Sequence, residues 1–126
     1  MSRNYRDLIA WQKGMELVEE VYRTSRELPR DELYGLVSQV RRAAVSVPVN
    51  VAEGQGRGSD AEFVRFLRIA HGSLREVETL ILIVRRLAFV SESVCDGLLD
   101  RAAELGRSLN GLVRSKRGDV GNDGPA

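Results

Sequence analysis

The chain has 126 residues, a mass of 14.0 kDa and a formal net charge of +1, from 19 basic and 18 acidic residues. This length fits one domain, and the near-neutral charge excludes a global field that would draw the chain to nucleic acid or to an anionic membrane. The single cysteine, Cys95, excludes an internal disulfide and favours a cytoplasmic protein, and no apolar run reaches the ~20 residues that a bilayer requires.

Two amphipathic helices are predicted in the first half of the chain. The first runs from Asp7 to about Thr24, with apolar residues at alternating steps of three and four, namely Leu8, Trp11, Met15, Val18 and Tyr22. The second follows Pro29 and keeps this spacing from Leu33 to Val51. Because Pro48 has no N–H, we expect a kink near the last turn of the second helix.

The stretch "NVAEGQGRGS", residues 50 to 59, resembles a phosphate-binding loop because it contains Gly54, Gly56, Gly58 and Arg57. A dinucleotide fingerprint needs a preceding strand and a P-loop needs a following Gly-Lys-Ser/Thr, and neither is present. An anion could still bind at the next helix N-terminus, but the nearby Asp60 would repel a phosphate. A helix-to-helix turn is therefore the favoured interpretation, with Gly54 in the left-handed conformation that ends a helix.

The second half of the chain predicts two further helices. Ser59 and Glu62 form a reciprocal capping pattern for a third helix, whose apolar stripe continues to Ala88. Ser91 caps a fourth helix that ends at Ser115. We therefore predict an all-α fold, an up-down-up-down antiparallel four-helix bundle over residues 1–115, followed by a disordered tail over residues 116–126.

The residues offer little for catalysis. His71 is the only histidine, so neither a zinc site nor a Ser-His-Asp arrangement is easy to assemble. A di-iron bundle needs Glu-x-x-His, but Arg68 stands three residues before His71. We expect no enzyme, no metal, no cofactor and no small-molecule substrate.

Basic residues are more suggestive, because several could track a phosphate backbone from one side of the molecule. These candidate nucleic-acid-binding residues are Arg41, Arg42, Arg57, Arg65, Arg68 and Arg75. The segment from Arg101 to Arg117 adds five basic residues against one acidic residue. The alternative is a solvated surface with dispersed charge, since exposed aromatic residues for stacking are scarce.

A second apolar stripe in the third helix predicts self-association. Leu80, Ile83 and Leu87 lie about a quarter turn from the core stripe, and a single bundle would leave them in water. Burying a leucine-sized side chain is worth ~1.5 to 3 kcal/mol, so these three are candidates for the interface of a homo-oligomer.

Three runs of residues resemble a known family. They are "DLIAWQKGMELVEEVY", "LYGLVSQVRRAAVSVPVNVAEGQGR" and "EFVRFLRIAHGSLREVETL". They are similar to the small bacterial four-helix-bundle proteins encoded in intervening sequences of 23S rRNA genes, which are related to accessory proteins of diversity-generating retroelements. The resemblance implies a ring-like homopentamer and, from the retroelement proteins, contact with RNA and a reverse transcriptase. It carries no catalytic residues, and its motif positions Asn50, Glu53, Gly54, Gly72, Ser73 and Glu76 are interpreted as structural.

Two functions follow from these observations. The first is a non-enzymatic oligomeric bundle that binds RNA or a ribonucleoprotein through an arginine-lined surface. The second is an oligomeric protein-interaction scaffold that contacts no nucleic acid. Convergence of the six arginines on one patch would favour the first function, whereas neutralisation of each by a neighbouring carboxylate would favour the second.

Overall fold

The structure, a computed structural model, describes residues 4–120, with side chains described to Arg117. It is all-α, as predicted, and the described residues contain no strand. The elements are η1 (Tyr5–Asp7), α1 (Ile9–Ser25), η2 (Arg30–Glu32), the π-helical η3 (Leu33–Val37), α2 (Ser38–Gln55), α3 (Asp60–Arg86) and α4 (Glu92–Val120).

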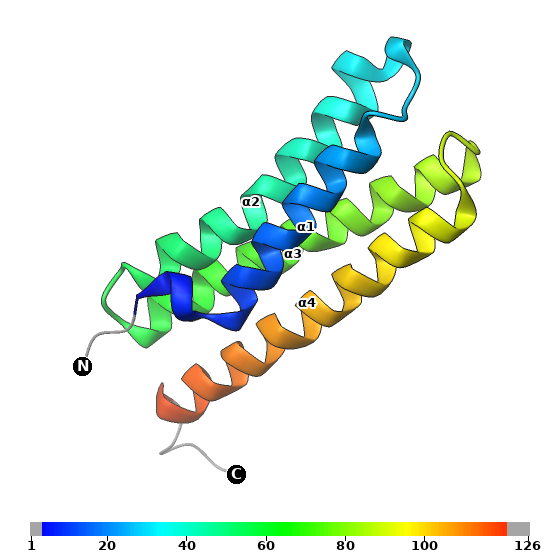
Figure 1. The fold of residues 1–126 in the computed structure, drawn as a ribbon. Helices are drawn as coiled ribbons and strands as arrows, with labels where there is room; N and C mark the ends of the chain where they lie inside the picture. The colour runs from blue at the N-terminus through cyan, green and yellow to red at the C-terminus, as the bar shows by residue number, and fades with distance from the viewer. Residues whose placement is uncertain (1–3, 121–126) are drawn as a thin grey trace.

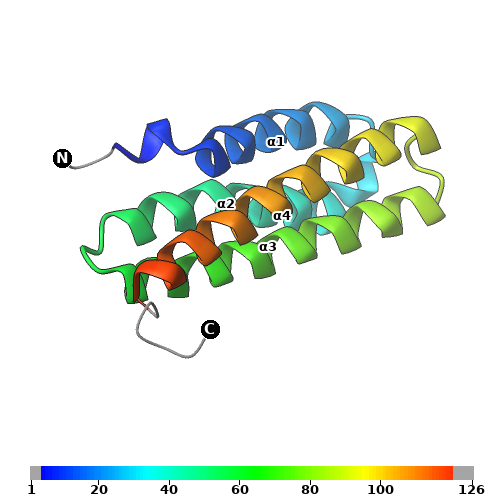
Figure 2. The ribbon, with the colours of Figure 1, turned by 90° about the horizontal axis from the view of Figure 1, so that it is seen from below.

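The four long helices lie side by side (Figures 1 and 2). Helix α2 packs against α1 and α3, and α4 packs against the same two helices from the other side. Their inward faces share one apolar core, whose largest fully buried side chains are Leu17, Leu67, Leu74, Leu105, Leu109, Val21, Val47, Val51 and Val77. Two of the helix–helix contacts, α1 with α2 and α2 with α3, therefore share helix α2.

The core-facing side of α1 differs from the sequence prediction. Of the predicted stripe, Leu8 is buried, but Met15 is 40% exposed and Tyr22 is 37% exposed. The residues of α1 that enter the core are instead Ala10, Gly14, Leu17 and Val21. The physical reason is a close approach of α1 to α2, since a Cβ at Gly14 would lie 3.3 Å from Cβ of Pro48.

The backbone of the second helical segment is irregular at its start. Gly35, within η3, has φ −111° and ψ −108°, and the Glu32 carboxylate accepts a hydrogen bond from the Leu36 N–H at 3.2 Å. Helix α2 continues through Pro48 to Gln55. The helix thus does not end at Pro48, as expected, and the kink there stays a prediction.

The turn between α2 and α3 assigns its glycines different roles from those predicted. Gly54 is helical and buried, and a Cβ there would lie 2.6 Å from Cβ of Phe66, so this glycine permits close packing. The left-handed residue is Gly58, with φ 88°. Ser59 caps α3 as predicted, because its hydroxyl accepts from the Glu62 N–H at 3.2 Å.

At the turn between α3 and α4, one residue that was predicted to lie in the third helix lies outside it. Ala88, placed in the third stripe by its spacing, lies beyond the end of α3, is exposed and has φ 57°. Ser91 precedes α4, and its hydroxyl accepts from the Val94 N–H at 3.3 Å. Helix α4 extends to Val120, past the predicted end at Ser115, and residues 121–126 of the predicted tail lie outside the described residues.

Candidate interaction surfaces

Two of the six candidate arginines gather at the turn between α2 and α3. Arg57 forms an ion pair with Glu53 at 2.9 Å, and Arg65 forms one with Glu62 at 3.1 Å. Both guanidinium groups lie over the ring of Phe66, at 4.9 and 4.6 Å from its centroid. These charges are therefore partly neutralised by carboxylates, one within α2's last turn and one within α3.

The other four arginines do not join that cluster. Arg75 forms an ion pair with Glu78 at 2.8 Å, and Arg41 donates to the Ser25 hydroxyl at 2.8 Å. The Arg41 guanidinium also lies 4.5 Å from the ring centroid of Tyr22. Arg42 and Arg68 are exposed and have no carboxylate partner among the described side chains. The structure thus divides the six arginines among separate sites, and three of them face a carboxylate.

The last turns of α4 carry cations of a different kind. Within the side chains described up to residue 117, no carboxylate pairs with Arg107, Arg114, Lys116 or Arg117. Lys116 lies over the ring of Phe63 at 5.8 Å from its centroid. Arg101, further back along α4, is 3.7 Å from the Glu16 carboxylate. Positive charge is therefore less compensated at the end of α4 than on α3.

The family motif residues include a polar bridge between α2 and α3. The hydroxyls of Ser46 and Ser73 are 2.7 Å apart, and the Asn50 amide donates to the Ser46 carbonyl at 2.8 Å. Asn50 is half-buried and fixes Ser46, the α2 residue of this bridge. Glu53 forms an ion pair with Arg57. Glu76 is exposed, and no cation pairs with it among the described side chains.

An apolar strip along α1 and α2, which the sequence reasoning missed, is a further candidate surface. It borders two adjoining hollows of about 790 and 540 Å³, which share Val45 and Val49. We define the α1–α2 strip as Trp11, Met15, Val18, Tyr22, Val45, Val49 and Ala52. The sequence signal that could have revealed this strip is the apolar arc of the first helix, which is too wide for all of its side chains to face the core.

Two of the three residues predicted to form an interface on α3 are exposed. Leu80 is only 6% exposed and belongs to the core, since its side chain lies beside the core stripe of α3. Ile83 and Leu87 are 38% and 52% exposed, and Ile69 on the same side of α3 is 42% exposed. We define the α3 strip as Ile69, Ile83 and Leu87.

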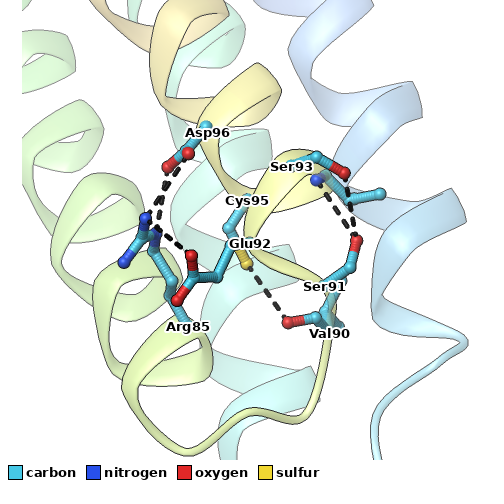
Figure 3. Close-up of polar contacts among 8 residues, drawn as sticks. Arg85, Val90, Ser91, Glu92, Ser93, Cys95 and Asp96 are labelled. Carbon is cyan, nitrogen blue, oxygen red and sulfur yellow. Dashed lines mark hydrogen bonds and ion pairs between the residues drawn. The ribbon is translucent and has the colours of Figure 1, made fainter.

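The one cysteine and the one histidine of the chain, Cys95 and His71, are fully and partly buried, respectively. Cys95 is buried beside the turn between α3 and α4, where its thiol faces the Val90 carbonyl at 4.0 Å (Figure 3). Burial raises the pKa of the Cys95 thiol, although Arg85 lies nearby and is paired with Asp96 at 2.9 Å. Burial also lowers the pKa of His71. The raised pKa keeps Cys95 in its thiol form, which is a poor nucleophile because the thiolate is the reactive form.

Metal sites and membrane-spanning helices are two further classes of feature. Within residues 4–120, no three His, Cys, Asp or Glu side chains gather in a way that could hold a metal ion. In the same part of the chain, no helix combines the length and the apolarity that crossing a bilayer demands.

The comparisons with known proteins agree with the fold described above. A crystal structure of a protein of unknown function from the S23 ribosomal protein family of Bacteroides thetaiotaomicron VPI-5482 is similar, with a TM-score of 0.77 and 18% sequence identity. The likeness covers 83% of this chain and 98% of that one, and at this identity it shows the fold alone. No match was found among curated proteins. Residues 6–111 match the family described as 23S rRNA-intervening sequence protein, and the chain therefore belongs to that family.

Proposed function

We propose that this chain is a non-enzymatic scaffold protein, an up-down-up-down antiparallel four-helix bundle that works as a homo-oligomer and presents a surface to a protein partner. The observation that supports this proposal most directly is the α1–α2 strip. A pentamer is the assembly that the family resemblance implies. The surroundings of His71 and Cys95, which favour the neutral forms of both groups, support the non-enzymatic part of this proposal.

The free energy available from the α1–α2 strip supports association. Four of its side chains are between 36% and 53% exposed, namely Met15, Tyr22, Val45 and Val49. Because full burial of such a side chain is worth ~1.5 to 3 kcal/mol, covering the exposed parts of these four contributes roughly 3 kcal/mol. A patch of this kind on a small protein is typical of an interaction site.

The mass of the protein in solution tests the proposal. Light scattering coupled to size-exclusion chromatography at tens of micromolar should give a multiple of 14.0 kDa, and a pentamer would give five times that mass. Dilution should lower the mass, because association follows mass action. A mass of one chain across the whole concentration range would refute self-association.

RNA binding is a second candidate function, and it is favoured by the cations of α4 that form no ion pair with a carboxylate among the side chains described up to residue 117. Phosphate contacts make affinity fall steeply with salt, so a mixed RNA pool should be measured at about 50 and 200 mM salt. A variant with Arg107, Arg114, Lys116 and Arg117 changed to Gln should lose binding and salt dependence. The matched control changes the carboxylate-paired Arg57, Arg65 and Arg75 to Gln and should retain most of the binding. If the unchanged protein binds no RNA at low salt, this candidate fails.

A further inference from the structure

We propose that the α1–α2 strip of one copy receives the α3 strip of a second copy, so that the two partners of each contact use different surfaces. This inference rests on the self-association proposed above and names the surfaces that carry it. The occupant of the α1–α2 groove is therefore a second copy of this chain, entered by the outer side of its α3.

The shapes of the two strips favour this pairing. The α1–α2 strip borders a groove between two helices, with its hollows meeting at Val45 and Val49. The α3 strip is a ridge on a single helix, and ridges of one helix pack into grooves between others. Packing the groove against its own copy would place two hollows face to face and leave space that no side chain fills.

The α3 strip is also long enough to span the groove. Ile69 and Ile83 are separated by 14 positions, two heptads, and so lie along nearly one line of α3. From Ile69 to Leu87 this line is about 27 Å long at 1.5 Å per residue. The α1 side of the groove runs about 16 Å from Trp11 to Tyr22, and Tyr5 extends the groove at the Trp11 end. The ridge can therefore fill the groove along its length.

Charge distribution supports the same pairing. Glu76 lies midway between Ile69 and Ile83, is exposed, and has no cation partner among the described side chains. The smaller hollow of the groove is bordered by Arg41 and Arg42, and Arg42 has no carboxylate partner in the same described region. An α3 strip that enters this groove brings the unpaired carboxylate toward unpaired positive charge.

The two strips lie on different sides of α2. Ile69 and Glu76 flank Ser73, which bonds to Ser46 of α2, so the α3 strip borders α2 from one side. The α1–α2 strip borders α2 from the other side. A contact between two different surfaces is heterologous, so each copy that uses one strip keeps its other strip for a further copy. Repetition of such a contact gives a ring where the rotation closes and a helical filament where it does not, and the mass in solution distinguishes the two.

Two complementary variants test the pairing. One carries Val45→Arg and Val49→Arg in the groove, and the other carries Ile83→Arg on the ridge. All three positions are at least 36% exposed, so each fold should survive, which circular dichroism checks. Each variant alone should be a monomer, with association weakened at least about a hundredfold, because a buried unpaired charge is strongly unfavourable. An equimolar mixture should form a heterodimer, since the intact ridge of the first variant can enter the intact groove of the second.

A matched control separates this contact from a general effect of added charge. Leu82 is 47% exposed and stands next to Ile83, but one position along α3 turns its side chain about 100° away. Leu82→Arg should therefore leave the oligomer intact. If the unchanged protein is monomeric, self-association itself fails. If it is oligomeric but Ile83→Arg does not dissociate it, or the mixed variants stay monomeric, self-association stands and this pairing of surfaces is refuted.

Discussion

The closest approach of α2 to α3 predicts that Gly54→Ala destabilises the fold. The added Cβ would lie 2.6 Å from Cβ of Phe66 and 3.1 Å from Cδ1 of Phe63. Carbon atoms pack at about 3.5 to 4.0 Å, and a Cβ cannot move without its backbone, so the helices must separate by about 1 Å. Overpacking of this kind costs about 3 kcal/mol, and the better helix propensity of alanine offsets about 1 kcal/mol. The net loss of unfolding free energy is therefore about 2 kcal/mol.

Urea unfolding followed by circular dichroism at 222 nm measures this loss, with all variants at one protein concentration because association adds to stability. The matched control is Gly97→Ala in α4, where no atom lies within 4 Å of the added Cβ. That variant should be as stable as the unchanged protein or more stable by up to about 1 kcal/mol. If Gly54→Ala behaves like Gly97→Ala, the argument that α2 and α3 are held together through a side-chain-free position is wrong.

Three further predictions concern single residues. Gly58→Ala should lower the free energy of unfolding by about 1 kcal/mol because φ is 88° there, whereas Gly56→Ala, which meets only ordinary contacts, should be near neutral in the same urea titration. Burial lowers the pKa of His71 below its ordinary value of 6.5, so the unfolded chain binds more protons and stability should fall as the pH drops from about 7 toward 5. His71→Gln should flatten that dependence in pH-resolved unfolding, and an unchanged slope would contradict the assignment. Cys95 should react slowly with a thiol reagent in the native protein and rapidly in urea, because burial shields the thiol and raises its pKa.

Local signals in the sequence were sufficient for most of the fold. Ser59 was correctly predicted to cap the third helix, because a capping hydroxyl and its N–H lie within one turn. Family membership is confirmed by the match over residues 6–111. The ion pairs of Arg57 and Arg65 join residues four and three positions apart, so local spacing was sufficient to predict these pairs.

Contacts between helices were the part that spacing could not supply. Periodicity shows that α1 has an apolar arc, but it does not show which part of a wide arc faces the core. For the same reason Leu80 was assigned to the surface although it is buried. The bond from Arg41 to Ser25 and the bridge between Ser46 and Ser73 join residues far apart in the chain, and nothing local marks them.

The rotation of α1 links its packing to the proposed assembly. At the crossing with α2, Gly14 presents no side chain and Pro48 is buried against it. This contact turns the small Ala10 and Gly14 inward and places Trp11 and Met15 along the groove. Rotating α1 to bury the larger side chains would insert them between the two helices and force the helices apart. A single copy therefore keeps its close helix packing while Met15 stays 40% exposed, and the proposed second copy over the groove would cover this side chain without disturbing the packing.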